Sequence, residues 1–128
     1  DNSLLAVRDI NHKYIVVERR KLMIKEVTGE EFEQLHTEGL VLADFFSSTC
    51  GPCKMLSFVL NDVEKQLGDQ VSILKIDFDK NKEQTEKYQV KGYPTLIVFK
   101  NGEELERVSG LQQKPAIVKM VESHMDEK

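Results

Sequence analysis

The sequence lacks several features that would place it in particular classes of protein. No apolar run approaches the roughly 20 residues that a membrane-spanning helix needs. The net charge of −4 gives no electrostatic reason to expect binding to nucleic acid. Tryptophan is absent. The 128 residues are enough for one domain with its own hydrophobic core but too few for two of ordinary size. With 40% hydrophobic and 31% charged residues, the composition is typical of one soluble globular domain.

Cysteine and histidine are also scarce, which limits the metal sites that the chain could build. The only cysteines are Cys50 and Cys53, and His12, His36 and His124 show no ligand spacing to each other or to that pair. Half of a zinc site is one interpretation of the pair, but zinc requires four ligands. A purely structural disulfide is another, and it is weak because closing so short a loop removes little entropy from the unfolded chain. We therefore expect no metal or other cofactor, and we favour a redox role for the pair.

Residues 40–55 have the pattern of a buried strand that leads through a short loop into a helix. The apolar run from Leu40 to Phe46 contains one carboxylate, Asp44, and a Ser-Ser-Thr loop follows it. After Cys53, apolar residues recur at helical spacing, at Met55, Leu56, Val59, Leu60 and Val63. The two cysteines therefore straddle the start of a helix.

Cysteines in this position favour thiol–disulfide exchange. Between them, Gly51 tolerates a tight approach of the two sulfur atoms, and Pro52 suits a first helical turn, where no backbone donor is needed. The unpaired N–H groups and the positive dipole end of the helix stabilise a thiolate at Cys50. That thiolate attacks a disulfide, and Cys53 is placed to resolve the resulting mixed disulfide.

Five segments of the chain resemble the thioredoxin family, in the order and spacing of that family. They are Asp44-Phe45, Cys50-Gly51-Pro52-Cys53-Lys54-Met55, Lys75-Ile76-Asp77, Gly92-Tyr93-Pro94-Thr95-Leu96 and Phe99-Lys100-Asn101-Gly102. The resemblance implies an α/β thioredoxin fold, with a central mixed β-sheet flanked by helices on both faces. It covers residues 22–128, which we expect to form the domain, and leaves residues 1–21 as a partly flexible N-terminal extension.

The resemblance also implies roles around the two cysteines. In the family the peptide bond before the proline that matches Pro94 is cis and its loop faces the dithiol, so Pro94 would shield the two thiols. Thr95 would present backbone to a substrate strand, and Gly110 aligns with a glycine of the docking surface. The expected substrate-binding residues are Thr49, Gly51, Pro52, Tyr93, Thr95 and Gly110.

Asp44 and Lys75 complete the expected catalytic set. A carboxylate in a buried strand is costly and has a raised pKa, which makes Asp44 a candidate proton acceptor for Cys53. The alternative is that Asp44 lies on a strand face and reaches water. Lys75 matches a family lysine that lies near this aspartate, although it could instead extend from a strand end to solvent.

The chain departs from the family at three positions. Thr49 and Phe46 stand where the family has tryptophan, and Phe58 replaces a proline that kinks the active-site helix. We expect a straighter helix and a smaller, more polar rim. We expect these changes to affect the choice of partner and the redox potential, and to leave the dithiol chemistry intact.

The remaining sequence predicts local structure at several places. Thr28 and Glu31 form a capping box before a helix that ends by Gly39, Asn81 caps a short helix through Tyr88, and Asn101-Gly102 is a hairpin turn. Residues 1–11 show no firm period, so we expect them to be poorly anchored. Residues 14–17 are β-prone and could form an edge strand or pack over the domain, and residues 19–21 are expected in a solvated turn. A leader or tag remnant is the alternative for the whole extension.

These observations favour a protein-disulfide reductase that uses a reversible Cys50–Cys53 dithiol. We expect a cytoplasmic monomer that acts on disulfide-containing clients and is recharged by thioredoxin reductase or another dithiol donor. One alternative is a secreted oxidoreductase with narrower clients, exported with a leader removed before Asp1. The other is a thioredoxin-fold binding subunit that holds a partner irrespective of turnover.

Overall fold

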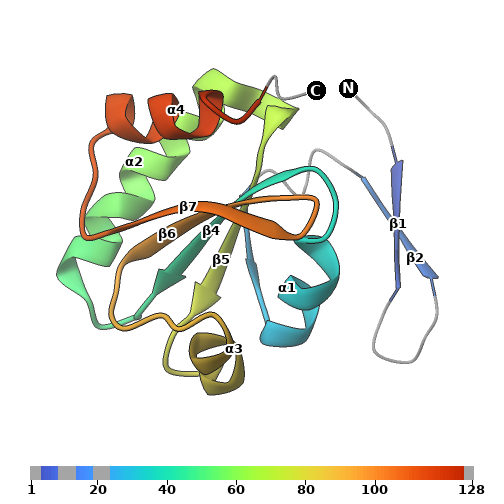
Figure 1. Cartoon of the computed structure of the whole chain (residues 1–128), viewed down its shortest axis with the longest axis horizontal. Helices are drawn as coiled ribbons and strands as arrows, with labels where there is room; N and C mark the ends of the chain where they lie inside the picture. Colours follow the sequence, from blue (N-terminus) through green and yellow to red (C-terminus); the bar gives the residue numbers. More distant parts are fainter. Residues whose placement is uncertain (1–3, 9–13, 19–23, 126–128) are drawn as a thin grey trace.

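The computed structural model describes residues 4–8, 14–18 and 24–125 (Figure 1). The strands are β1 (Leu4–Arg8), β2 (Tyr14–Glu18), β3 (Ile24–Val27), β4 (Leu40–Phe46), β5 (Ser72–Asp77), β6 (Thr95–Lys100) and β7 (Glu103–Ser109). The helices are α1 (Gly29–Leu35), α2 (Gly51–Leu67), α3 (Lys82–Lys87) and α4 (Lys114–Glu122), and a short 3-10 turn covers Gly68–Gln70. Among the described residues, no helix combines the length and the apolar character needed to cross a membrane.

Five strands form one mixed sheet in the order β3-β5-β4-β6-β7. The first three are parallel, whereas β6 runs antiparallel to β4 and β7 antiparallel to β6. Helices α2 and α4 cover one face of this sheet and α1 covers the other, as Figure 1 shows. The predicted class, a mixed sheet with helices on both faces, is therefore confirmed.

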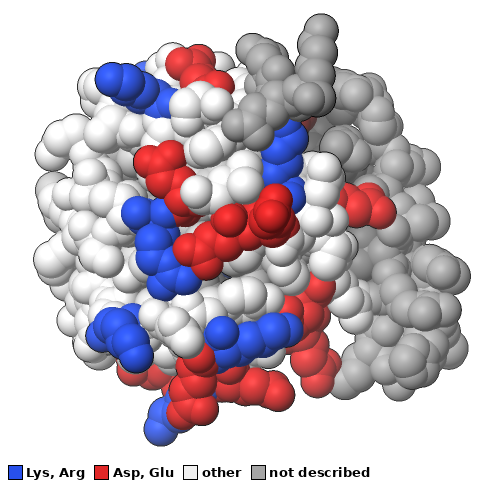
Figure 2. Space-filling view, viewed as in Figure 1, with Lys and Arg blue, Asp and Glu red and all other residues white. Residues whose placement is uncertain are grey.

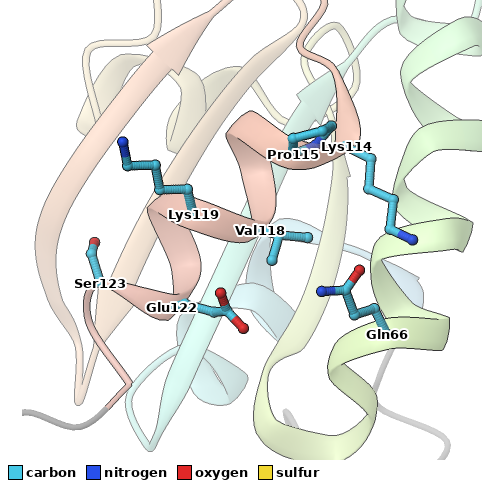
Figure 3. A pocket seen from close by; sticks show the side chains of 7 residues that line it. All are labelled: Gln66, Lys114, Pro115, Val118, Lys119, Glu122 and Ser123. Carbon is cyan, nitrogen blue, oxygen red and sulfur yellow. The ribbon is translucent and has the colours of Figure 1, made fainter.

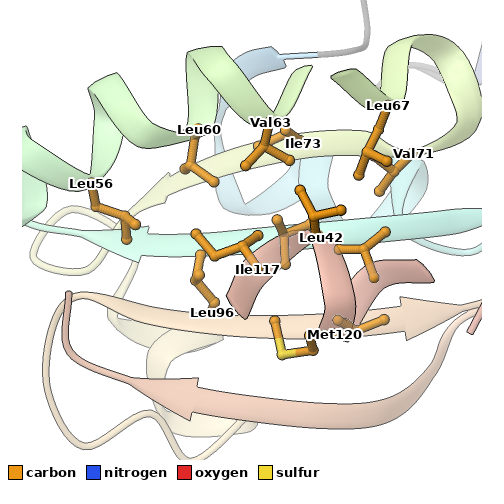
Figure 4. Close-up of a cluster of buried hydrophobic side chains, with 13 residues drawn as sticks. Leu42, Leu56, Leu60, Val63, Leu67, Val71, Ile73, Leu96, Ile117 and Met120 are labelled. Carbon is orange, nitrogen blue, oxygen red and sulfur yellow. The ribbon is translucent and has the colours of Figure 1, made fainter. Parts of the chain in front are cut away.

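The alternation of side chains along β4 divides the core into two clusters. Leu42 belongs to the cluster under α2 and α4, with Leu56, Leu60 and Ile117 (Figure 4). Its neighbours Val41, Ala43 and Phe45 belong to the other cluster, with Phe32 of α1. Because strand residues two apart share a face, Asp44 points to the same side as Leu42, toward α2.

Two of the predicted local motifs are confirmed. The Thr28 hydroxyl accepts a hydrogen bond from the Glu31 N–H, and the Glu31 carboxylate accepts one from the Thr28 N–H, which forms the capping box of α1. Asn101 and Gly102 connect β6 to β7 with positive φ values of 52° and 86°. Both residues of such a two-residue hairpin turn need this left-handed backbone.

Two other local predictions are wrong in detail. Helix α1 ends at Leu35, so Gly39 lies in the following turn and not at the helix end. Asn81 occupies the cap position of α3, but its side chain makes no capping hydrogen bond. Instead its Oδ1 accepts from the Gly29 N–H at 2.8 Å and its Nδ2 donates to the Asp77 carbonyl at 2.9 Å. Asn81 therefore ties the start of α1 to the end of β5.

The N-terminal extension contains a pair of strands that the sequence only partly predicts. β1 and β2 form an antiparallel sheet of their own, separate from the five-stranded sheet. The prediction of a strand at residues 14–17 is confirmed, although β2 pairs with β1 and not with the edge of the main sheet. Residues 4–8, for which the sequence shows no firm period, form the strand β1 in this separate sheet. Predictions for residues 1–3, 9–13 and 19–23 lie outside the described residues.

Candidate active site

The turn between β4 and α2 places Cys50 directly before the first residue of the helix, Gly51. The Cys50 N–H donates to the Ser47 carbonyl at 3.2 Å, and the Cys50 carbonyl accepts from the Lys54 N–H at 3.2 Å. Cys50 has extended backbone angles and is the N-cap of α2, where its Sγ accepts from the Cys53 N–H at 3.1 Å. A sulfur atom therefore occupies the place that a serine or aspartate oxygen takes in an ordinary helix cap.

Cys50 and Cys53 are joined by a disulfide bond, with Cα atoms 5.2 Å apart. Cys50 is partly exposed, whereas Cys53 is 4% exposed and faces the core. No acidic residue lies in the first turn of α2, so no carboxylate there offsets the positive end of the helix dipole. In the reduced protein this environment favours a thiolate on the accessible Cys50 and leaves Cys53 sheltered behind it.

The loop before Cys50 is anchored by Ser47, which the sequence did not identify. Ser47 is 2% exposed, and its hydroxyl donates to Asp79 Oδ2 at 3.0 Å. The same hydroxyl lies 3.2 Å from Thr49 Oγ1 and 3.4 Å from the Thr49 N–H. Since a hydroxyl has one proton and two lone pairs, donation to Asp79 leaves Ser47 to accept both hydrogen bonds from Thr49. This small network fixes the loop that ends at Cys50.

Asp44 is buried without a hydrogen-bonding partner. It is 0% exposed, so the alternative of a strand-face residue in contact with water is excluded. Among the described residues, no donor bonds to either of its carboxylate oxygens. Burial raises the pKa of Asp44 from 3.8 to about 7, and the positive charge of Lys75 opposes part of this rise. A carboxyl group that titrates near neutral pH can both accept and release a proton under physiological conditions.

Lys75 lies next to Asp44 but does not bond to it. The two residues are register partners on the parallel strands β4 and β5, so their side chains leave the sheet on the same face. The Lys75 ammonium instead donates to Ser57 Oγ of α2 at 2.9 Å, and it lies 5.2 Å from the centre of the Phe46 ring. The side chain therefore extends under α2.

The loop before β6 meets the active-site loop at the same end of the sheet. Thr95 is the register partner of Phe45 on antiparallel strands, so β6 begins beside the place where β4 ends. The Tyr93–Pro94 peptide bond is cis, as the family resemblance predicts. The Pro94 carbonyl accepts from the Gly110 N–H at 2.8 Å, which links this loop to the one before α4.

Side chains around this end of the sheet differ in their exposure. Pro94 and Thr95 are buried, and the Thr95 hydroxyl donates to the Gly92 carbonyl at 2.8 Å. Tyr93 is exposed and its ring contacts Phe78, with centroids 5.2 Å apart. Thr49, directly before Cys50, and Gly51 and Pro52, between the two cysteines, are also exposed. The topology thus brings the predicted rim residues to one end of the sheet, and Asp44 and Lys75 lie under the helix that begins there.

A hollow lies between α2 and α4 (Figure 3), and the cysteines are not among its lining residues. Its lining combines charged, polar and apolar side chains: Gln66, Lys114, Pro115, Val118, Lys119, Glu122 and Ser123. Gln66 is near the end of α2, 16 residues from Cys50, which corresponds to about 24 Å along a helix. This hollow therefore takes no part in chemistry at Cys50. Among the described residues, no group of three or more metal-binding side chains could hold a metal ion.

Comparisons with known proteins agree with the geometry of this site. A family model described as thioredoxin matches residues 23–123. The chain is 41% identical over 104 residues to a thioredoxin of Bacillus subtilis (strain 168), an alignment that covers 81% of this chain and 100% of that protein. It is 44% identical over 102 residues to a thioredoxin of Chlamydia trachomatis, with 80% and 99% covered. A solved structure of a mutant thioredoxin from Halobacterium salinarum NRC-1 superimposes with a TM-score of 0.73 at 36% identity, covering 82% of this chain and 93% of that one.

Proposed function

The chain belongs to the thioredoxin family and is a thiol–disulfide oxidoreductase with a redox-active Cys50–Cys53 pair, and we propose that it reduces client disulfides with Cys50 as the nucleophile and Cys53 as the resolving thiol. The observation that carries this division of roles is the difference in exposure between the two cysteines at the start of α2. The accessible sulfur at the helix N-terminus is the one that a client disulfide can reach.

The first half of the reaction forms a mixed disulfide. The Cys50 thiolate attacks one sulfur atom of the client disulfide, a bond forms between Cys50 and that sulfur, and the other client sulfur leaves as a thiolate. The helix N-terminus stabilises the attacking thiolate before this step. Ser47, held by Asp79, keeps the loop before Cys50 in place during the attack.

The second half releases the client in reduced form. The Cys53 thiol gives its proton to the Asp44 carboxylate, and the Cys53 sulfur attacks Cys50 Sγ. The bond between Cys50 and the client breaks, the client leaves as a thiolate, and the Cys50–Cys53 disulfide forms. Asp44 suits this step because it faces α2, has no hydrogen-bonding partner and has a pKa of about 7. Its proton then passes to solvent.

The exposed rim is proposed to bind the client around the reacting sulfur. Thr49, Gly51, Pro52 and Tyr93 are exposed, and the loop containing Pro94 begins a strand beside them. Backbone groups of Thr95 and Gly110 on this side would pair with an extended client segment, in the manner of strand addition. The small, polar Thr49 makes this rim less apolar than a tryptophan would.

We propose residues 22–128 as the catalytic domain and a monomer as its working form. Its partners are disulfide-containing proteins, and thioredoxin reductase or another dithiol donor restores the reduced state. The face in Figure 2 intersperses Lys and Arg with Asp and Glu, which does not favour a nucleic-acid partner. The cytoplasm is the proposed compartment, because both cysteines belong to the redox pair and neither serves as a structural crosslink of the kind common in secreted domains.

Reduction of insulin by dithiothreitol, followed by turbidity, tests this function. The wild type should accelerate the reaction, and Cys50→Ser should abolish the acceleration. Cys53→Ser should also stop turnover, but it should accumulate a mixed disulfide on Cys50 that mass spectrometry can locate. Ser48→Ala, an exposed residue of the same loop, is the matched control and should keep full activity. Turnover by Cys50→Ser would refute the assignment of the nucleophile.

A further inference from the structure

We propose that Ser57 is a positioning residue whose hydroxyl holds the Lys75 ammonium on α2 and thereby prevents it from forming an ion pair with Asp44. The consequence for catalysis rests on the proposed role of Asp44 as proton acceptor. Ser57 itself touches no reacting atom in this scheme, and it acts only through Lys75.

The geometry around Lys75 carries this inference. Lys75 and Asp44 are register partners on parallel strands and leave the sheet on the same face, so their opposite charges are close enough to interact. The ammonium nevertheless donates to Ser57 Oγ at 2.9 Å, and the Phe46 ring lies 5.2 Å away. Both Asp44 oxygens have no donor among the described residues. A lysine that could neutralise a buried carboxylate is therefore bound to a helix hydroxyl.

Ser57 is not the residue that helix propensity alone would favour at its place in α2. It lies in the helix interior, directly after Leu56, which is fully buried in the core. Serine is less favourable than alanine inside a helix, because its hydroxyl competes for backbone hydrogen bonds. Here the hydroxyl accepts from a lysine 18 residues away in the chain. A residue that opposes local propensity and makes one specific tertiary contact indicates a role beyond packing.

Groups other than Lys75 do not supply the positive charge that acts on Asp44. On β5, Asp77 lies on the same face as Lys75, but its Oδ1 accepts from the N–H groups of Asp79 and Lys80. On β6 the register partner of Asp44 is the apolar Leu96. At the start of α2, Cys50 and Cys53 are joined in the oxidised protein, and Lys54, Asp62 and Lys65 of the same helix are exposed to solvent. Lys75 is thus the cation that acts on Asp44.

The position of the ammonium determines how strongly Asp44 holds a proton. If the ammonium bonded to the carboxylate, the ionised form would be stabilised and Asp44 would become a weaker base toward the Cys53 thiol. With the ammonium held by Ser57, the carboxylate keeps its affinity for the proton that Cys53 releases. The proton moves from Cys53 to Asp44, the Cys50–Cys53 bond forms, and the client thiolate departs.

Two variants at one position test the inference. Ser57→Ala removes the hydroxyl, and Ser57→Thr keeps it in the same helix. The titration of the Asp44 carboxyl carbon is followed by NMR in the oxidised proteins, where neither cysteine titrates. Ser57→Ala should lower the titration midpoint by about one pH unit, as expected when a cation moves next to a carboxylate. Ser57→Thr should keep the wild-type midpoint.

An unchanged or raised midpoint in Ser57→Ala, or an equal decrease in Ser57→Thr, would overturn the inference. A second measurement distinguishes failure of this inference from failure of the proposed role of Asp44. It is the rate at which a preformed mixed disulfide on Cys50 releases the client, measured at pH 8 in a single turnover. Slower release by Ser57→Ala together with a lowered midpoint supports both. A lowered midpoint with an unchanged release rate supports the placement of Lys75 by Ser57 and refutes Asp44 as the base.

Discussion

Replacing Asp44 by asparagine removes a charge that the folded protein buries without a partner. The side chain is 0% exposed and neither oxygen accepts a hydrogen bond from a described residue. An unfolded chain hydrates the same carboxylate fully. The Asp44→Asn protein should therefore be more stable than the wild type wherever Asp44 is ionised in the folded state.

The size of the effect follows from the raised pKa of Asp44. The difference between an ordinary value of 3.8 and about 7 corresponds to about 4 kcal/mol, at 1.36 kcal/mol for each pKa unit. A buried amide without a partner costs about 1–3 kcal/mol, but the protonated carboxyl of the wild type is buried without a partner too, so these two costs roughly cancel. We therefore expect a net stabilisation of up to about 4 kcal/mol at pH 8.

The gain depends on pH in a defined direction. Because the folded-state pKa is raised, the folded protein binds the Asp44 proton more tightly than the unfolded chain does. The stability that this proton contributes is fully present below about pH 4 and is lost as the pH rises toward about 7. The difference between Asp44→Asn and the wild type should thus be small near pH 4, grow through this window, and level off above it.

Urea denaturation followed by circular dichroism measures this difference, since the chain has no tryptophan to report by fluorescence. The experiment is run at pH 4, 6 and 8 on the wild type, Asp44→Asn and the control Asp62→Asn, an exposed carboxylate of α2. The control should differ little from the wild type at each pH. A destabilised Asp44→Asn protein at pH 8, or a difference that does not change with pH, would refute the picture of a buried and unpaired charge.

Three further predictions concern the rim, a helix cap and the N-terminal extension. Thr49→Trp should lower the apparent KM for a flavin-dependent thioredoxin reductase by roughly tenfold, because a buried aromatic contact contributes about 1.5 kcal/mol or more. The rate with a small-molecule disulfide should hardly change, and an equal KM would contradict the docking argument. Thr28→Ala should cost about 1 kcal/mol in urea denaturation through loss of the capping box, and no loss would show that the cap is dispensable. Removing residues 1–21 takes away both strands of the separate sheet, so the Tm should change by less than about 4 °C and insulin reduction should be retained. A large loss of either would place the extension within the domain.

The features of the fold and of the site that the sequence predicts are those determined by residues close together in the chain. The helix start at Cys50 follows from the residues on either side of it. The apolar run around Asp44 predicts a buried strand, although only the structure excludes contact of Asp44 with water. The capping box of Thr28 and the turn at Asn101 involve residues at most three positions apart. In each case the local pattern and the tertiary structure favour the same conformation.

Contacts between polar side chains that are distant in the chain could not be predicted from the sequence. Ser47 meets Asp79 across 32 residues and Lys75 meets Ser57 across 18, so both pairs exist only once β4, β5 and α2 are assembled. The predicted cap of α3 by Asn81 was wrong for the same reason. Its side chain had a local partner available at the start of α3, but the Gly29 N–H, 52 residues away, binds it instead. Local propensity does not rank such competing partners.

Alkylation of the reduced protein tests the division of roles between Cys50 and Cys53 most directly. The reduced wild type is treated with iodoacetamide over a range of pH, and mass spectrometry gives the rate at each cysteine. Cys50 should react far faster than Cys53 and should remain reactive below the pH at which an ordinary thiol is protonated, because the start of α2 stabilises its thiolate. Equal rates at the two cysteines, or faster modification of Cys53, would contradict the assignment of Cys50 as the nucleophile.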